Sequence, residues 1–376
     1  MRRYGVPTAW AVLLCMFLAC PALAEDISVA ARAAILMDGE SGRVLWALNA
    51  DTRYPMASTT KIMTALLALE RCALDELVTA SENASGVPGT SIYLGAGEQL
   101  TMRDMLLGLM LRSGNDAAVA IAEHVSGDVE HFAQLMNARA AALGADANFV
   151  TPNGLDEPGH GATARAMALI AREALSNETF REIVATQRAV IPWRDSEYSR
   201  VLVNKNRLLR EYEGATGVKT GFTSAAGRCL VFSAQRNGME LIGVVMNCGG
   251  WFEEAKKLLD WGFRNYARAT ALRAGETAAV IPVTGGRTDS VAAVAREELG
   301  AAVCAADEWF LEVLPAGSLA APVERGARVG VARLVVNGEA LSQTDLLAAA
   351  DVARLDFATA LGMVTAAWPW PEAGRV

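Results

Sequence analysis

Apolar residues recur along the first 270 positions in two patterns, one typical of strands and one of helices. Residues 33–37 and 45–49 read as two strands around a turn that contains Gly39 and Gly42. Strands, a helical middle and further strands closed by a helix predict an α+β domain. The first expected helix begins at residue 58, and a second covers 101–125 with an interruption at 113–115. Further helices are expected at 130–143, 163–175 and 253–266, and later strands at 217–222, 228–234 and 240–248.

The dipeptide Asn237-Gly238 between the last two strands is typical of a two-residue hairpin turn. It places Cys229 opposite Met246 and makes Cys248 a diagonal neighbour, so the two cysteines are expected to lie too far apart for a disulfide. The cysteines and histidines show no metal-ligand spacing, so we expect neither a metal nor a cofactor. The cysteines after residue 24 are Cys72, Cys229, Cys248 and Cys304, and the histidines are His124, His131 and His160.

Beyond the first domain, which we assign to residues 25–270, the pattern changes. Residues 271–342 predict a small β domain, and residues 343–376 predict an amphipathic helix and tail that Pro369 and Pro371 end. This helix either lies on a membrane surface with interfacial tryptophans, Trp370 among them, or packs on its own protein. Its polar face has almost no Lys or Arg, so attraction to anionic lipid would be weak. The apolar face consists of Ala350, Ala353, Phe357, Leu361, Val364 and Trp368.

Residues 1–24 predict an export signal, with Arg2 and Arg3 before an apolar core and a small-residue cleavage site at 22–24. The alternative is an uncleaved membrane anchor, but the core is shorter than the roughly 20 residues that a span needs. We therefore expect the protein at the outer face of the cytoplasmic membrane or in the cell-wall space. The formal net charge of −8 argues against nucleic acid as a partner, because binding phosphates requires a basic face.

Ser58 and Lys61 stand three residues apart at the start of the first helical run. One interpretation of a serine at this position is purely structural, as a helix N-cap. The spacing also places both side chains on one helix face, where a buried neutral lysine could take the proton of a nucleophilic serine. Two triplets favour the nucleophile: Ser113-Gly114-Asn115 in the helical break and Lys219-Thr220-Gly221 on an expected strand.

With these motifs in this order, the chain resembles the D-alanyl-D-alanine carboxypeptidases, which are low-molecular-mass penicillin-binding serine peptidases. The resemblance is close over about residues 30–270 and includes the segments 159–171, 204–209 and 256–263. It implies the fold shared by serine β-lactamases and D,D-peptidases, an antiparallel sheet beside a helical subdomain. It also implies peptidoglycan stem peptides as substrates and β-lactam antibiotics as covalent inhibitors.

The resemblance implies three catalytic residues. Ser58 would attack the carbonyl between the two terminal D-alanines, and Lys61 would be the general base. Ser113 would relay the proton to the leaving D-alanine. The backbone N–H groups of Ser58 and Phe222 would form the oxyanion hole.

The resemblance also implies the substrate-binding residues. Asn115 would hold the peptide side of the substrate. Lys219, Thr220 and Thr223 would bind its terminal carboxylate. Gly221 would let the substrate lie against the strand edge, where a side chain would obstruct it.

Other activities at the same serine stay open. A β-lactamase needs a base for deacylation, and we interpret the pair Glu173 and Asn177, which has suitable spacing, as coincidental. A non-catalytic penicillin-binding protein is disfavoured because every motif side chain is present. Endopeptidase and transpeptidase reactions pass through the same acyl-enzyme. We expect His160 to be a structural residue of its loop.

Overall fold

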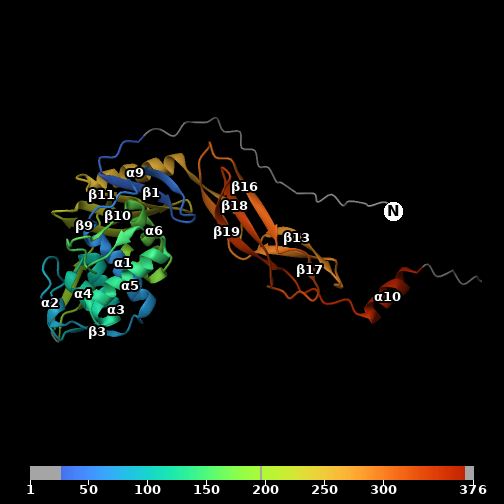
Figure 1. Cartoon of the computed structure of the whole chain (residues 1–376), viewed down its shortest axis with the longest axis horizontal. Coiled ribbons are helices and arrows are strands. Elements are labelled where there is room, and N and C mark those ends of the chain that lie inside the picture. Colours follow the sequence, from blue (N-terminus) through green and yellow to red (C-terminus); the bar gives the residue numbers. More distant parts are fainter. Residues whose placement is uncertain (1–26, 195–196, 369–376) are drawn as a thin grey trace, which may run out of the picture. The chain divides into compact units, whose positions relative to one another are not determined.

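The computed structural model describes residues 27–194 and 197–368. The expected export signal, Trp370 and the two prolines beside it lie outside these described residues. The chain forms two compact units, of which the first ends at Ala267 and the second begins at Arg268. Figure 1 shows both units.

The first unit is built around a five-stranded antiparallel sheet in the order β2-β1-β11-β10-β9. Asn237 and Gly238 join β10 to β11 with φ of 51° and 78°, as a type I′ turn requires. Leu230 pairs with Val245, which aligns the neighbouring Cys229 with Met246 as predicted, and both Cys229 and Cys248 are free thiols. The strands are β1 Ala33–Asp38, β2 Val44–Leu48, β9 Ala215–Thr223, β10 Gly227–Arg236 and β11 Met239–Met246.

Helices form most of the segment between β2 and β9, as the apolar periodicity predicts. The interruption expected at 113–115 is found at Ser113 and Gly114, while Asn115 already begins α4: a π-helical turn, η2, has Ser113 as its C-cap, with φ of 66°. The helical elements are η1 Ala57–Thr60, α1 Lys61–Arg71, α2 Glu82–Ser85, α3 Met102–Leu107, η2 Gly108–Arg112, α4 Asn115–Ser126, α5 Val129–Ala142, α6 Ala164–Leu175, α7 Glu178–Ala185 and α8 Leu208–Glu211. Three short strand pairs complete the segment: β3 Leu77–Thr79 with β4 Gln99–Thr101, β5 Ala147–Asn148 with β6 Gly161–Ala162, and β7 Arg188–Pro192 with β8 Ser199–Val203.

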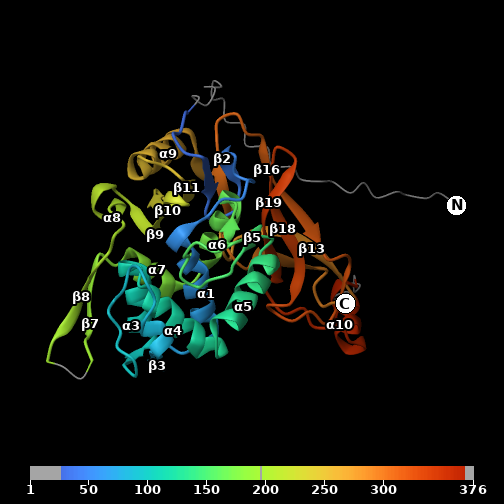
Figure 2. The same cartoon turned by 60° about the vertical axis from the view of Figure 1, so that its left-hand side comes forward.

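The sheet is covered on both faces. Helix α9, Trp251–Asn265, packs on β10 and β11 from one side, while α6 packs on β1 and β11 from the other, as Figure 2 shows. A Cβ on Gly262 would lie 2.6 Å from Leu241 Cδ1, so only glycine lets α9 approach the sheet this closely. The main core lies between the sheet and the helical elements, and α1, which follows Ser58, is buried in it.

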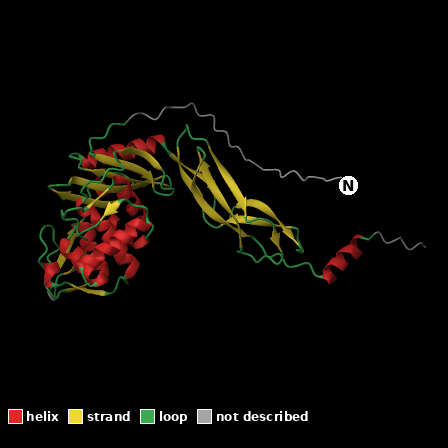
Figure 3. Cartoon of the chain, viewed as in Figure 1, coloured by secondary structure: helices red, strands yellow, loops and turns green. Residues whose placement is uncertain are grey.

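Figure 3 shows that the second unit is predominantly β-structure. Its buried apolar side chains form a core of their own. It contains a two-stranded sheet, β12-β15, and a six-stranded sheet in the order β16-β18-β19-β14-β13-β17. The strands are β12 Ala267–Leu272, β13 Thr277–Thr284, β14 Ser290–Ala295, β15 Leu299–Val303, β16 Trp309–Pro315, β17 Leu319–Ala320, β18 Arg328–Val336 and β19 Glu339–Ala348.

The C-terminal helix is shorter than the periodicity from Ala350 indicates. Residues 343–348 belong to β19, and Val352 forms a β-bridge with Val323. Helix α10, Phe357–Ala367, begins only where the Asp356 carboxylate accepts a hydrogen bond from the Thr359 N–H. Within the described part of the chain, no helix has the length and apolar character to cross a bilayer.

Candidate active site

Ser58 lies in the 3₁₀ turn η1, directly before α1. The N-cap positions of η1 and α1 are Met56 and Thr60, so the N-cap interpretation of Ser58 is wrong. Instead, Ser58 Oγ lies 2.9 Å from Lys61 Nζ. The spacing of three residues therefore brings the hydroxyl and the amine into hydrogen-bond contact, as the nucleophile interpretation requires.

Lys61 is fully buried, and its amine has two further partners. Lys61 Nζ lies 2.8 Å from Asn115 Oδ1 and 2.5 Å from the carbonyl oxygen of Asn153. Burial lowers the pKa of Lys61 well below its usual value, and the positive charges of Lys219 and Lys205 lower it further. The amine is thereby biased toward its neutral form.

The three contacts of Lys61 Nζ can be satisfied by the neutral amine that its lowered pKa favours. The oxygens of Asn115 and Asn153 can only accept hydrogen bonds, so they take the two N–H groups. In that neutral form, the lone pair is left for the Ser58 hydroxyl, which can then donate its proton to Nζ across the 2.9 Å contact. This geometry orients Lys61 to accept the proton of Ser58.

The break between η2 and α4 brings Asn115 of the second motif to the Lys61 amine. Ser113 and Asn115 are both buried, and the left-handed backbone of Ser113 ends one helical segment before Asn115 begins the next. Asn115 Nδ2 donates to the carbonyl oxygen of Pro88 at 2.7 Å, while its Oδ1 accepts from Lys61. The amide of Asn115 thus holds the lysine amine in position.

The loop before this motif is held from two sides. The Asp116 carboxylate accepts hydrogen bonds from the N–H groups of Ile92 and Leu94. The buried Arg200 guanidinium donates to the carbonyl oxygens of Ile92 and Tyr93 and forms a buried ion pair with Glu98. Tyr93 between these anchors has φ of 63° and an exposed ring.

The third motif lies on β9, an edge strand of the sheet that packs against η1. Lys219 is buried, and desolvation with the charge of Lys205 lowers its pKa to about 7. Thr220 is buried and Phe222 is exposed. Thr223 Oγ1 donates to Asp156 at 2.8 Å, which ties the end of β9 to the loop that contains Asn153.

Gly221 has a structural role that sequence reasoning did not identify. A Cβ at this position would lie 3.0 Å from the Ser58 nitrogen and 3.1 Å from the Ala57 Cβ. Glycine therefore permits the close approach of β9 to the turn that carries Ser58. Gly154 acts similarly from the opposite loop, since its Cβ would overlap the Ala57 carbonyl.

Two contributors to the site could not be recognised from the sequence. The Asn153 carbonyl is a backbone group of a long loop, and no side-chain motif signals its contact with Lys61. Lys205 lies in the segment 204–209, and its Nζ lies 3.4 Å from Thr90 Oγ1. Its charge lowers the pKa of both motif lysines, so it completes a group of three lysines.

His160 supports the turn that carries Ser58, in agreement with the structural role expected for it. The ring is buried, and its Nδ1 accepts a hydrogen bond from the Val150 N–H at 3.0 Å. Nε2 therefore carries the proton and donates to Thr60 Oγ1 at 2.9 Å, and this hydroxyl donates to the Ala57 carbonyl at 2.8 Å. Ala57 itself has φ of 49°.

This histidine should make stability depend on pH in the acid range. Burial lowers its folded-state pKa to about 4, against 6.5 in the unfolded chain, so the unfolded chain binds the proton first. We expect roughly 3 kcal/mol of stability to be lost as the pH falls from about 6.5 to about 4. Urea unfolding of the protein and of His160→Gln across this range would measure the loss.

The Gln variant should show a smaller loss over the same pH range, because it removes the titrating group. His131→Gln is the matched control, since His131 is exposed and pairs with Asp128. Equal pH dependence of the native protein and His160→Gln would rule out His160 as the cause.

Other residues considered from the sequence lie in ordinary structural contacts. Glu173 pairs with Arg139, and Asn177 caps α7 through the Phe180 N–H. These contacts agree with the interpretation that their spacing is coincidental.

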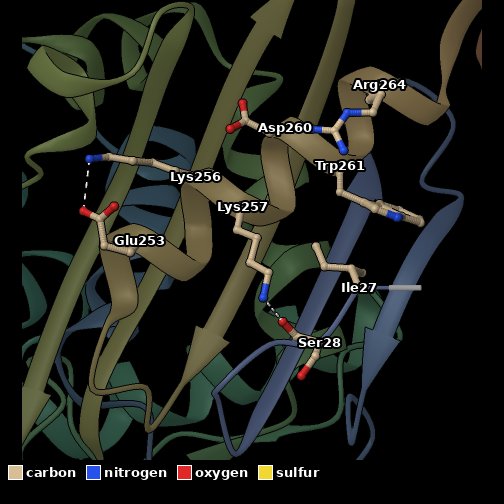
Figure 4. Close-up of a pocket in the computed structure, with 8 residues that line it drawn as sticks. All are labelled: Ile27, Ser28, Glu253, Lys256, Lys257, Asp260, Trp261 and Arg264. Atoms are coloured by element: carbon tan, nitrogen blue, oxygen red, sulfur yellow. Dashed lines mark hydrogen bonds and ion pairs between the residues drawn. The ribbon is translucent and has the colours of Figure 1, made fainter. Parts of the chain in front are cut away.

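A surface pocket of about 650 Å³ runs along α9 and contains none of the motif residues. Figure 4 shows that its lining is charged, with Lys256 paired to Glu253 and Lys257 bonded to the Ser28 carbonyl. We assign no catalytic function to it.

Comparison with known proteins agrees with this geometry. A family model described as D-alanyl-D-alanine carboxypeptidase, Peptidase_S11, matches residues 21–250. The chain is 32% identical over 356 residues to D-alanyl-D-alanine carboxypeptidase DacF of Bacillus subtilis, covering 92% of this chain and 91% of that protein. It is 35% identical over 343 residues to DacC of Escherichia coli, covering 86% and 84%.

Solved structures agree as well. Penicillin binding protein 5 from Haemophilus influenzae superposes with a TM-score of 0.71 at 32% identity, covering 88% of this chain and 99% of that one. A mutant of a DD-transpeptidase from Streptomyces superposes with a TM-score of 0.61 at 34% identity, covering 64% of this chain and all of that one.

Proposed function

Because the chain belongs to the D-alanyl-D-alanine carboxypeptidase family, and because Lys61 Nζ lies 2.9 Å from Ser58 Oγ, we propose that Ser58 is the nucleophile of this penicillin-binding serine peptidase and Lys61 its general base. The substrate is the peptidoglycan stem peptide that ends in D-Ala-D-Ala. The observation that carries the proposal is the orientation of the Lys61 amine, whose two N–H groups are engaged elsewhere.

In the first half of the reaction, Ser58 Oγ bonds to the carbonyl carbon between the two D-alanines while its proton passes to Lys61. The oxyanion that forms is stabilised by the N–H groups of Ser58 and Phe222. The C–N bond then breaks, and Ser113 relays the proton held by Lys61 to the leaving nitrogen, so that the lysine amine is neutral again. Free D-alanine and an ester on Ser58 are the products.

Water hydrolyses this ester in the second half: Lys61 accepts a proton from the water and returns it to Ser58 Oγ, and the shortened stem peptide leaves. Asn115 would contact the peptide side of the substrate with the N–H that its contact to Pro88 does not use. The terminal carboxylate would bind Lys219, Thr220 and Thr223. A carboxylate next to Lys219 would favour its charged form, although its pKa is about 7 without substrate.

The test is release of free D-alanine from a diacyl-Lys-D-Ala-D-Ala tripeptide, together with penicillin labelling and mass mapping of the labelled peptide. We expect D-alanine release and a label on Ser58. Labelling without release would leave three alternatives: a transpeptidase, a β-lactamase or a silent binding protein. Assays with an added amine acceptor and of penicillin turnover would distinguish them. A label on another residue would refute the nucleophile assignment.

Export is the second part of the proposal. The basic residues, apolar core and small-residue site of residues 1–24 support cleavage after Ala24 and action outside the cytoplasmic membrane. Determining the N-terminus of the protein recovered from cells tests this directly, and an intact Met1 would contradict cleavage.

We also propose that α10 lies on a lipid surface, with Phe357, Leu361 and Val364 on the inserted face. Their exposed fractions are 83%, 51% and 56%, so the described part of the chain does not bury these apolar side chains. Burial of one such side chain contributes about 1.5–3 kcal/mol. With few basic residues nearby, the attraction would be apolar rather than electrostatic.

Leu361→Glu should therefore weaken binding to phosphatidylcholine vesicles by at least about tenfold. Ala366→Glu is the matched control, because it adds the same charge on the opposite side of the helix at 100° per residue. Vesicle co-sedimentation measures both. Equal loss in the two variants, or no binding by the native protein, would remove the lipid assignment and favour packing on protein.

A further inference from the structure

The far ends of α1 and α4 meet at a cluster that the peptidase reaction does not use. Lys61 begins α1 and Asn115 begins α4, and these two side chains touch at the active site. At the other ends, Cys72 is the C-cap of α1 and His124 lies in the last turn of α4. Glu76 joins them from the loop after α1.

The three side chains offer a convergent set of ligand atoms. Cys72 Sγ, a Glu76 carboxylate oxygen and a His124 ring nitrogen all lie within 4.8 Å of one another. His124 Nε2 is 3.1 Å from Glu76 Oε2. A tetrahedral zinc ion, with its usual bond lengths, needs ligand atoms about 3.3–3.6 Å apart, so modest side-chain rotation suffices.

The surroundings of the cluster also favour a cation. Two helix C-termini, those of α1 and α4, point their carbonyl ends toward this region, and such ends attract positive charge. The other oxygen of Glu76, Oε1, accepts a hydrogen bond from the Ala73 N–H. That bond orients the carboxylate so that Oε2 is directed at His124, as supporting contacts do in metal sites.

We propose that Cys72, Glu76 and His124 bind a zinc ion, with water as the fourth ligand. Thiolate, imidazole and carboxylate together suit zinc rather than calcium or magnesium, which take oxygen ligands. On binding, the thiol of Cys72 gives up its proton, and the metal replaces the proton that His124 Nε2 shares with Glu76. The ion would link the far ends of the two helices whose first residues hold the catalytic amine.

Cobalt is the probe for the first test, because a thiolate–cobalt bond produces an intense near-ultraviolet charge-transfer band. We expect the reduced native protein to bind one cobalt ion with this band and zinc to abolish the band by displacement. Cys72→Ser should lose the band, and His124→Ala should weaken zinc binding by more than about tenfold. Cys304→Ser and His131→Ala are matched controls that should bind as the native protein does, since neither residue belongs to the cluster.

A thermal measurement gives an independent readout. At a hundredfold excess of zinc over its Kd, the melting temperature of the native protein should rise by about 5 °C or more, and that of Cys72→Ser should not. No band with millimolar cobalt, or an unchanged band in Cys72→Ser, would overturn the site. The prediction does not depend on the peptidase assignment, because it requires no substrate and touches no motif residue.

Discussion

Ser58→Ala is expected to lower the rate of D-alanine release by roughly 10⁴–10⁶-fold, because removing a catalytic serine leaves only binding and oxyanion stabilisation. The same variant should form no covalent adduct with penicillin. The change removes one partly exposed oxygen atom whose close contact is Lys61 Nζ, so the fold should be kept. Steady-state release and mass spectrometry of the penicillin-treated protein measure the two effects.

Ser176→Ala is a suitable control for this change. Ser176 ends α6 and its hydroxyl contacts only the Glu173 carbonyl, so this variant should act as the native enzyme does. Release by Ser58→Ala within tenfold of the native rate would show that another group attacks the substrate, and the mechanism proposed from Ser58 and Lys61 would be wrong.

Lys61→Met should lower kcat/KM and the penicillin acylation rate by about 10²–10⁴-fold, the usual contribution of a general base. Lys61→Arg distinguishes the two roles that the lysine could have. Arginine keeps the positive charge but does not accept a proton near neutral pH, so it should be as inactive as methionine if Lys61 is the base. In the native enzyme, kcat/KM should fall as the pH drops through the lowered pKa of Lys61.

The control for these variants is Lys256→Met, which removes the surface ion pairs of this α9 residue with Glu211 and Glu253 and should leave the rate unchanged. Circular dichroism must show that the Lys61 variants are folded, because the change leaves the buried oxygens of Asn115 and Asn153 without their partner. A folded and active Lys61→Arg variant would mean that Lys61 acts through its charge, and the base would have to be sought elsewhere.

Local sequence patterns predict most of the scaffold because they report local physics. The turn at Asn237-Gly238 determines the register of β10 and β11, and the break at Ser113 follows from polar residues that interrupt a helical period. The motif side chains meet because their spacing places Ser58 and Lys61 on one turn. The start of α10 was predicted too early, since a bridge to a distant strand at Val352 overrides the local periodicity.

What sequence patterns could not supply are contacts between distant segments. The carbonyl of Asn153 acts through its backbone, and the closeness of β9 that Gly221 permits appears only when the sheet and η1 are placed together. Cys72 and His124 lie 52 residues apart in the chain, and only the packing of α1 on α4 unites them. Spacing rules for metal ligands therefore miss this cluster.

The position of β9 at the border of its sheet has a consequence for aggregation and selectivity. A free strand edge can pair with any extended chain, including another copy of the protein. Here η1, α7 and α8 pack along β9. The middle of the strand is buried, and at its C-terminal end only the side chains of Phe222 and Thr223 reach solvent. So short an open edge suits the tip of a peptide and offers too little length for a second protein strand. The same packing that holds Ser58 against β9 would thus leave the last residues of the strand accessible to the end of the substrate.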